Sequence, residues 1–274
     1  MPDEAEAIEL GLVLDAIHRR YGYDLREYVS DTIERRLRAV LARSGMKHLG
    51  EIQHRLLHDP DWFLDLLDQL TVQVSEMFRD PPFYRAFRER VVPVLRTYPE
   101  LRIWHAGCAS GEEVYATAIL LTEENLYERT QIYATDLSAS ALESAREGVY
   151  RKARAALFAD NYLRAGGAGS LDAYYSAAYE RIVMRDALKR NLVFFQHNLA
   201  TDYAIGDMNV IFCRNVLFYF DKPLRRRVLG TFADALRRGG FLCLGASESA
   251  PSELLETFSS FAPKERIFRR AGEA

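Results

Sequence analysis

The chain has 274 residues, of which 49% are hydrophobic and 27% charged, and this balance predicts a soluble globular protein of one large or two unequal domains. The net charge of −3 excludes a global attraction to nucleic acid or to an anionic membrane surface, so any electropositive site must be local. The three cysteines include no CxxC pair, which argues against a disulfide framework and a zinc site, and we expect no bound metal. Because there is neither a signal peptide nor an apolar stretch long enough to cross a bilayer, we expect a cytoplasmic protein without direct membrane insertion.

Residues 1–75 are predicted to form a helical domain. Apolar residues recur at helical spacing from Leu10 to Tyr21, and Gly22 suits a helix C-cap. A second helix is predicted to begin near Ser30, and a group of arginines lies away from its apolar face: Arg35, Arg36, Arg38 and Arg43. Such a basic face is either a solvated surface or a binding surface for an acidic partner, and the pattern alone leaves both open.

Residues 70–82 predict an extended linker that turns into the next helix at its Arg-Asp-Pro-Pro sequence. Gln73, Ser75 and Arg79 are spaced so that they would converge on a ligand. Arg79 would hold a carboxylate through two parallel hydrogen bonds. The alternative is an ordinary interdomain linker.

Residues 101–113 predict a buried strand, a loop of small residues and the start of a helix, which is the ligand-approach turn of a doubly wound α/β sheet. Gly107 and Gly111 allow a ligand to come close to the backbone. The loop differs from the GxGxxG of dinucleotide folds, and its helix opens with Glu112 and Glu113. Two carboxylates would repel a pyrophosphate but favour a cationic ligand. The alternative is that they only complement the helix dipole.

A second predicted strand ends in Asp136, which is placed to accept the two hydroxyls of a ribose. A ribose, a cationic head and no phosphate together describe S-adenosylmethionine better than NAD.

Further strands are predicted at 191–196, 208–213 and 241–245, with a final edge strand within 264–270 and an inserted subdomain at about 150–190. The strand ends at Gly107, Asp136, Asn198 and Arg214 would all face one crevice. That crevice, at the carboxyl edge of an open α/β sheet, is the expected binding site.

Several segments carry a resemblance to a known family: Phe78-Arg-Asp-Pro81, His105-Ala-Gly-Cys-Ala-Ser-Gly-Glu-Glu113, Ala134-Thr-Asp136, Phe212-Cys-Arg-Asn-Val216, Tyr219-Phe-Asp-Lys-Pro223 and Leu244-Gly-Ala-Ser-Glu248. With these segments in order from about residue 8 to 270, the chain resembles the chemoreceptor glutamate methyltransferases, the CheR family. The resemblance implies an α/β fold with a Rossmann-like class I methyltransferase sheet. It also implies a helical domain at 1–75, an S-adenosylmethionine-binding domain at 76–274 and a small β subdomain inserted at about 150–190. The implied activity is methylation of glutamate side chains on the helical cytoplasmic domain of chemoreceptors, with S-adenosylhomocysteine as product, and we expect a monomer.

The crevice and the resemblance together give the candidate cofactor-binding residues: Gln73, Ser75, Arg79, Gly107, Glu112, Glu113, Asp136, Asn198, Leu199, Arg214 and Asn215. The resemblance implies that Arg79 binds the methionine carboxylate and Asp136 the ribose. It also places Tyr219 near the transferred methyl group. This sequence has Gln73 where the family usually has Asn, and Val114 where it usually has Pro.

A glutamate side chain has a pKa of about 4.3, so it is already ionised at neutral pH and its methylation needs no general base. The enzyme then has to orient the carboxylate and exclude water, and Tyr219 or Arg79 would supply a positioning hydrogen bond. Two other interpretations stay open, a small-molecule methyltransferase on the same fold and a non-catalytic cofactor-binding module. The arginines of the second helix favour a macromolecular substrate over a small one.

Overall fold

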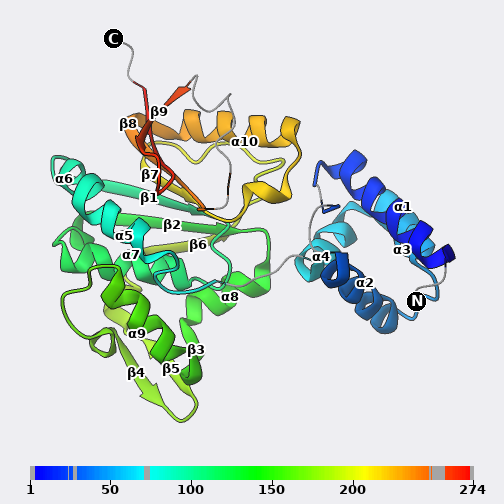
Figure 1. Ribbon diagram of the computed structural model, residues 1–274, viewed down its shortest axis with the longest axis horizontal. Coiled ribbons are helices and arrows are strands. Elements are labelled where there is room, and N and C mark those ends of the chain that lie inside the picture. The colour runs from blue at the N-terminus through cyan, green and yellow to red at the C-terminus, as the bar shows by residue number, and fades with distance from the viewer. Residues whose placement is uncertain are drawn as a thin grey trace. The chain divides into compact units, whose positions relative to one another are not determined.

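A computed structural model describes residues 4–23, 25–26, 30–70, 75–246, 248 and 257–271 (Figure 1). The chain divides into two compact units, Met1–Val72 with Val216–Val228, and Gln73–Asn215 with Leu229–Ala274. Residues 216–228, which the sequence predicts as part of the second domain, group with the helical unit. Among the described residues, no helix combines the length and the apolar character that a membrane crossing requires.

The N-terminal part of the first unit is helical, as predicted: α1 (Glu4–Tyr21), α2 (Ser30–Ser44), α3 (Leu49–His58) and α4 (Pro60–Leu70). Helix α1 ends at Gly22, whose φ of 79° suits a residue without a Cβ and whose N–H bonds the His18 carbonyl. Asp59 caps α4 by accepting a hydrogen bond from the Trp62 N–H at 3.0 Å. Apolar side chains at helical spacing, such as Leu37, are fully buried between these helices.

Residues 216–228 join this unit at the end of α1. Tyr23 and Phe220 form an antiparallel bridge, and the two rings pack edge to face with centroids 5.6 Å apart. Asp221 caps helix α10 (Lys222–Ala235) through the Leu224 N–H, and its carboxylate also lies 3.4 Å from His18. The end of α1 and the start of α10 are therefore fixed to each other.

The second unit is built on a seven-stranded sheet of order β6-β2-β1-β7-β8-β10-β9. Its strands are β1 (Leu101–Ala106), β2 (Thr130–Asp136), β6 (Leu192–Gln196), β7 (Met208–Cys213), β8 (Leu236–Leu244), β9 (Phe258–Ala262) and β10 (Ile267–Arg270). The five strands β6, β2, β1, β7 and β8 are parallel to their neighbours. Strand β10 is antiparallel to both of its neighbours, β8 and β9. The chain passes from β1 outward through β2 and β6, then returns to β7 on the other side of β1. The point where the direction reverses, between β1 and β7, is where open α/β sheets bind ligands.

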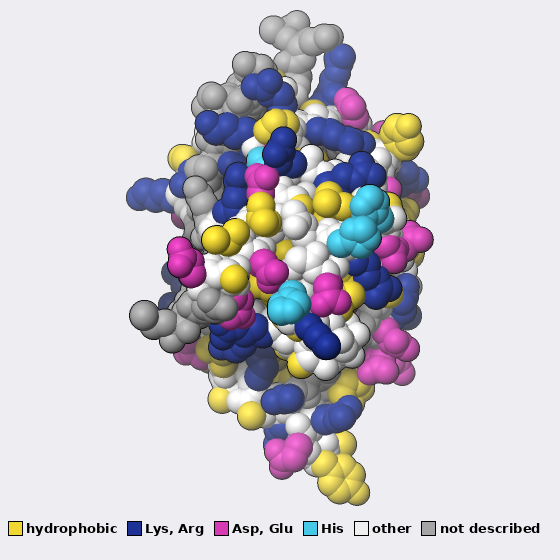
Figure 2. Space-filling view, turned by 90° about the vertical axis from the view of Figure 1, so that its right-hand side faces the viewer, with side chains coloured by type: hydrophobic (Ala, Val, Ile, Leu, Met, Phe, Trp, Pro, Cys, Tyr) yellow, Lys and Arg dark blue, Asp and Glu magenta, His cyan; other side chains and the backbone are white. Residues whose placement is uncertain are grey.

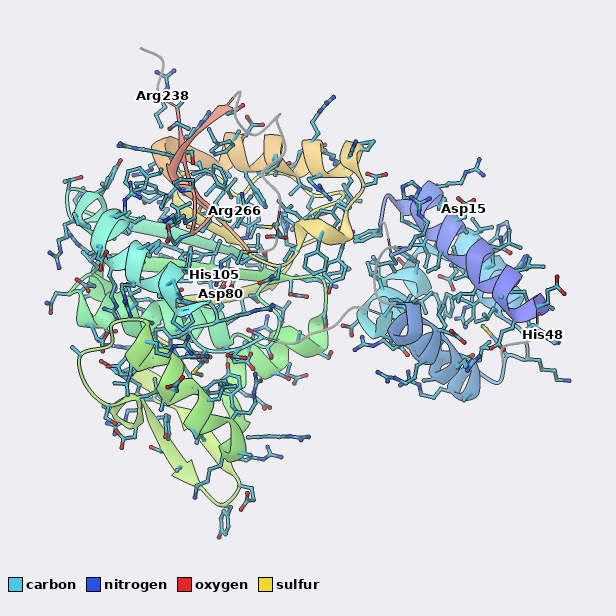
Figure 3. The ribbon with its side chains drawn as sticks, in the orientation of Figure 1. Asp15, His48, Asp80, His105, Arg238 and Arg266 are labelled. Atoms are coloured by element: carbon cyan, nitrogen blue, oxygen red, sulfur yellow. The ribbon has the colours of Figure 1, made fainter. Side chains whose placement is uncertain are left out.

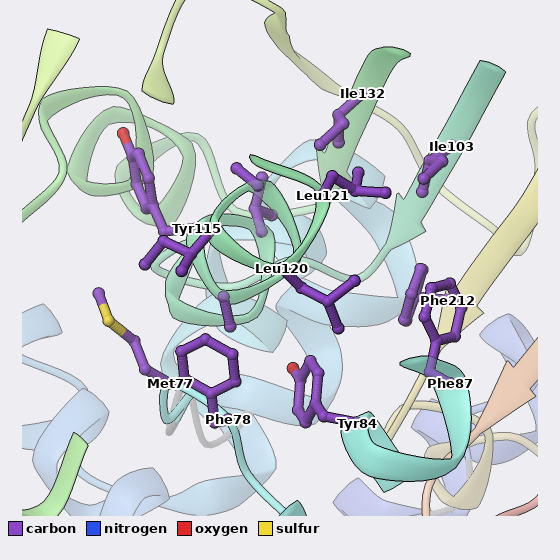
Figure 4. Close-up of a cluster of buried hydrophobic side chains, with 14 of the residues drawn as sticks. Met77, Phe78, Tyr84, Phe87, Ile103, Tyr115, Leu120, Leu121, Ile132 and Phe212 are labelled. Carbon is purple, nitrogen blue, oxygen red and sulfur yellow. The ribbon is translucent and has the colours of Figure 1, made fainter. Parts of the chain in front are cut away.

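Helices cover both faces of the sheet. The helical elements of this unit are α5 (Pro81–Ala86), the π-helical turn Phe87–Val91, α6 (Val92–Leu95), α7 (Glu112–Glu123), α8 (Ala139–Glu147), α9 (Ala155–Arg164) and the part of α10 from Leu229 onward. Short 3-10 turns of this unit lie at Tyr127–Arg129, Lys152–Arg154, Leu171–Tyr174 and Asp186–Leu188, and a further one, Leu217–Tyr219, belongs to the first unit. In Figure 4, Ile103 of β1 and Phe212 of β7 face a core that includes Leu120 of α7 and Tyr84 of α5. The neighbouring Trp104 points to the opposite face and packs on Phe232 of α10 at 5.3 Å, as strand alternation requires.

Two predicted strands near the end of the chain are present, but one differs in its place in the sheet and the other in where it begins. The predicted edge strand, β10, lies inside the sheet between β8 and β9, and β9 is the edge strand that the pattern missed because Ser259 and Ser260 interrupt its apolar residues. Strand β8 begins at Leu236 rather than 241, because Leu236 pairs with Met208 before a register shift.

The predicted insertion forms a separate antiparallel sheet of order β3-β5-β4, from β3 (Val149–Arg151), β4 (Tyr175–Ala178) and β5 (Arg181–Met184), with α9 between β3 and β4 in the chain. We call residues 149–184 the inserted subdomain. The fold class is thus confirmed: a helical N-terminal part, a mostly parallel sheet covered by helices, and a small inserted sheet.

Candidate functional site

The loop after β1, residues 107–111, is attached to the end of β2. The N–H groups of Gly107 and Cys108 both donate to the Thr135 carbonyl, at 2.8 and 2.9 Å. Ala109 has a φ of 47° and donates its N–H to the Asp136 carboxylate at 2.7 Å. A Cβ on Gly111 would lie 2.8 Å from that of Ala145, so the glycine also lets the loop pack against α8.

Asp136 is half-buried at the carboxyl end of β2. Its second oxygen accepts a hydrogen bond from the Ser138 N–H at 3.0 Å, just before α8 begins. The His197 N–H donates to the Asp136 carbonyl, which brings the end of β6 to the same edge of the sheet. The carboxylate is therefore held in a defined orientation at the edge where a ribose is expected.

Glu112 and Glu113, at the start of α7, face different parts of the second unit. Glu112 is 2% exposed, and its two oxygens accept hydrogen bonds from Arg154 at 2.9 Å and from the Ser110 hydroxyl at 2.6 Å. Glu113 contacts Arg214 at 2.7 Å and His105 Nδ1 at 3.2 Å. Consecutive helical residues point about 100° apart, which explains the separate partners.

Arg214, directly after β7, is the centre of a buried charge cluster. Its side chain is 1% exposed and contacts Asp80 and Glu113, each at 2.7 Å, while its guanidinium lies 4.2 Å from the centre of the Phe83 ring. Figure 3 labels Asp80, which belongs to this cluster, and His105, which contacts Glu113. Burial alone would raise the pKa of Glu113, but Arg214 and His105 outweigh it and hold that pKa below its usual value.

The linker residues predicted to bind the cofactor occupy different environments. Arg79 is exposed, and its side chain forms no hydrogen bond or ion pair with another described residue, whereas its carbonyl accepts a hydrogen bond from Arg214. The Ser75 carbonyl accepts a hydrogen bond from Arg154 at 2.7 Å. Gln73 lies outside the described residues. An exposed guanidinium without a described partner suits a carboxylate ligand.

The remaining predicted cofactor residues follow β6 and β7. Asn198 stabilises its own turn by accepting a hydrogen bond from the Ala200 N–H, and Leu199 is 7% exposed. Asn215 has a φ of 63° and donates its N–H to Glu248 at 3.1 Å.

Tyr219 belongs to the first unit, in the turn Leu217–Tyr219, where its ring packs on Phe218 at 4.2 Å. Its predicted place near the transferred methyl group stays a prediction.

The arginines of α2 also belong to the first unit. Arg38 forms ion pairs with Glu6 at 2.8 Å and Glu34 at 2.6 Å. The guanidinium groups of Arg36 and Arg43 donate to the backbone and side chain of Gln69, at 3.2 and 2.7 Å. Arg35 is exposed and has no ion-pair partner among the described residues. On the face that Figure 2 shows, Lys and Arg side chains are interspersed with Asp and Glu rather than gathered in one patch.

Sequence reasoning missed the residues that support the site from elsewhere in the chain. Arg154 comes from the inserted subdomain and Asp80 from the linker, and neither lies in a pattern that indicates its partner. His105, which also contacts Glu113, is 1% exposed and stacks on Phe212.

Comparison with known proteins identifies the family. The family model for the CheR methyltransferase SAM binding domain matches residues 73–265, and that for the CheR methyltransferase all-alpha domain matches residues 8–71. Cher3 of Pseudomonas putida is 44% identical over 96% of this chain and 97% of that protein. The chemotaxis protein methyltransferase 1 of Pseudomonas aeruginosa is 32% identical over 79% of this chain and 81% of its own length.

Among solved structures, the N-methyltransferase NodS of Bradyrhizobium japonicum, in complex with S-adenosylhomocysteine, is similar with a TM-score of 0.41 and 14% identity, over 81% of this chain and 97% of that one. That likeness is too slight to add to the assignment. The family matches settle it, with S-adenosylmethionine as the cofactor: the chain belongs to the CheR family of S-adenosylmethionine-dependent methyltransferases.

Proposed function

We propose that this enzyme transfers the methyl group of S-adenosylmethionine to glutamate side-chain carboxylates of chemoreceptors, and so forms glutamate methyl esters during chemotaxis adaptation in the cytoplasm. The name of the relative from Pseudomonas aeruginosa, a chemotaxis protein methyltransferase, supports this substrate class. The observation that carries the proposal is chemical. At the sheet edge, His105 and His197 each place one ring nitrogen against a group of the chain and bury the other, as expected where the nucleophile needs no base.

The histidines illustrate this point. His105 is buried against Phe212 and bonded to Glu113, and His197 Nε2 lies 3.0 Å from the Tyr203 carbonyl. Neither is placed to take a proton from an incoming amine or alcohol. A glutamate nucleophile is ionised well below neutral pH and brings no proton to remove. Its carboxylate attacks the methyl group in line, and the opposite charges of nucleophile and sulfonium are neutralised as the bond forms.

The chain's residues then hold and orient the reactants. Asp136 would accept hydrogen bonds from the ribose, and Arg79 would bind the carboxylate of the methionine part. The bound cofactor supplies an electrophilic methyl group on a sulfonium. In this proposal Tyr219 donates a hydrogen bond that positions the substrate carboxylate, which is an orientation effect rather than base catalysis.

A receptor fragment provides the test. Incubation of a cytoplasmic receptor fragment with the enzyme and S-adenosylmethionine should add methyl groups to glutamates, as located by mass spectrometry. Mild alkali should release the methyl groups as methanol, because esters are hydrolysed and methylated amines are not. A fragment with glutamine at the modified positions is the matched control. Methylation that survives alkali, or that reaches the glutamine control equally, would contradict the proposal.

A further inference from the structure

The inserted subdomain contacts the loop after β1 through two side chains. The Tyr150 hydroxyl, from β3, donates to the Ser110 carbonyl at 2.9 Å. Arg154, from the turn between β3 and α9, donates to Glu112 at 2.9 Å, and Glu112 in turn accepts the hydrogen bond of the Ser110 hydroxyl. The same loop residue, Ser110, is thus held on both its backbone and its side chain by groups that depend on the insertion.

Arg154 also reaches the linker. Its second terminal nitrogen donates to the Ser75 carbonyl at 2.7 Å, so one planar guanidinium bridges the start of α7 and the segment that leads to Arg79. The guanidinium lies 4.8 Å from the centre of the Phe158 ring, which restricts its orientation. A forked, planar donor suits such a bridge, whereas a lysine would present a single point charge.

The partners of these contacts, Glu112 and Tyr150, are both buried, so the loss of a contact would disturb the loop. Glu112 is 2% exposed, so loss of Arg154 would leave a buried carboxylate without a cationic partner, and the carboxylate would turn toward water and release Ser110. Tyr150 is 7% exposed, and burial together with the nearby Glu112 raises its pKa, so its hydroxyl stays protonated and can donate to Ser110.

We propose that Arg154 is a positioning residue of the cofactor site, through which the inserted subdomain, together with Tyr150, fixes the loop 107–111 and the linker at Ser75 in the conformation that binds S-adenosylmethionine. This inference rests on the proposed placement of the cofactor at that loop and linker. Because binding and conformation are linked, cofactor binding also strengthens the attachment of the insertion.

Calorimetry with S-adenosylhomocysteine tests the inference without any receptor. Arg154→Ala should weaken binding roughly tenfold, which corresponds to the loss of one charge-assisted contact. Arg154→Lys should recover part of the affinity. Arg164→Ala is the matched control, because Arg164 is also an arginine of the insertion but its side chain is exposed and pairs only with the exposed Asp160 among the described residues. The Arg164→Ala variant should bind S-adenosylhomocysteine as tightly as the unmodified enzyme.

Two further readouts separate positioning from general stabilisation. In turnover assays, Arg154→Ala should raise KM for S-adenosylmethionine and leave kcat at saturating cofactor unchanged. Glu112→Gln and Arg154→Ala should be non-additive in a double-mutant cycle, since both act on Ser110. If Arg154→Ala does not fold, Tyr150→Phe and Arg154→Lys carry the test, and each should bind severalfold more weakly.

The outcomes distinguish this inference from the proposal it rests on. The positioning role is overturned if Asp136→Ala weakens binding of S-adenosylhomocysteine but Arg154→Ala does not. If Arg154→Ala does not fold, unchanged affinity in both Tyr150→Phe and Arg154→Lys has the same meaning. If Asp136→Ala also leaves the affinity unchanged, the cofactor lies elsewhere and both proposals fail. An additive double-mutant cycle overturns the route through Glu112.

Discussion

Arginines occur both near the loop 107–111 and along α2, but their environments differ. The Arg214 side chain is 1% exposed and enclosed by two carboxylates and an aromatic ring. On α2, Arg35 is exposed, and Arg38 is balanced by glutamates at the surface. A buried charge must be paired and so fixes the structure around it, whereas an exposed one acts mainly at long range and is screened by salt. Burial, rather than charge, therefore separates supporting from steering arginines.

The largest effect is expected from Arg214. Arg214→Leu would leave Glu113 and Asp80 without their shared cation, so the free energy of unfolding should fall by about 3–5 kcal/mol. Urea unfolding followed by circular dichroism measures this change. Arg79→Ala, in the linker that Arg214 contacts, is the control, since its exposed side chain has no described partner and its removal should change stability little. Equal losses in the two variants would show that the Arg214 cluster does not support the fold.

Cofactor affinity should respond next. Asp136→Ala removes an acceptor for the ribose hydroxyls and should weaken S-adenosylmethionine binding by about 1–3 kcal/mol. Arg79→Ala should act in the same direction by removing a charge-assisted pair with the methionine carboxylate. Calorimetry on the folded variants gives both values. An unchanged Kd in either variant would remove that residue from the proposed site.

The sequence predicts features that depend on neighbouring residues, but not contacts between distant segments. The strand, loop and helix at 101–113 follow from local patterns, and so does the position of Asp136 at a strand end. The partners of Glu112 and Glu113 do not, because Arg154 and Arg214 come from distant segments that only the fold brings together. Residues 216–228 follow β7 in the chain, which predicts them in the second domain, but Phe220 pairs with Tyr23 and Asp221 contacts His18, both at the end of α1.

A smaller effect on folding stability is expected at low pH, where Glu113 becomes protonated. The folded-state pKa of Glu113 lies below its unfolded value, so its ion pair contributes fully above pH about 4.3. That contribution is lost as the pH falls through the lower folded-state pKa. Glu113→Gln should therefore be less stable than the unmodified enzyme at neutral pH and should lose less further stability on acidification. Urea midpoints measured from pH 7 to pH 3 test this, and parallel curves for the two proteins would contradict it.

The smallest effect is expected from charge reversals on α2, which should change KM for the receptor but not the affinity for the cofactor. Steering by exposed charge raises the association rate with an acidic receptor bundle and makes it sensitive to salt. Arg35→Glu should therefore raise KM for receptor at low salt and flatten its salt dependence. Arg38→Glu should do less, because Glu6 and Glu34 already balance that arginine. Cofactor affinity should stay unchanged in both variants.

Arg19→Glu provides the matched control for this prediction. Arg19 is an exposed arginine of α1 in the same unit and pairs with the exposed Asp15, so its reversal changes the net charge by the same amount at a different place and compares directly with that of the paired Arg38. Initial rates of receptor methylation at several ionic strengths, alongside cofactor calorimetry, compare the three variants. If Arg19→Glu raises KM as much as Arg35→Glu, only the net charge matters. If Arg35→Glu keeps the KM of the unmodified enzyme at every salt concentration, α2 is a solvated surface and the receptor binds elsewhere.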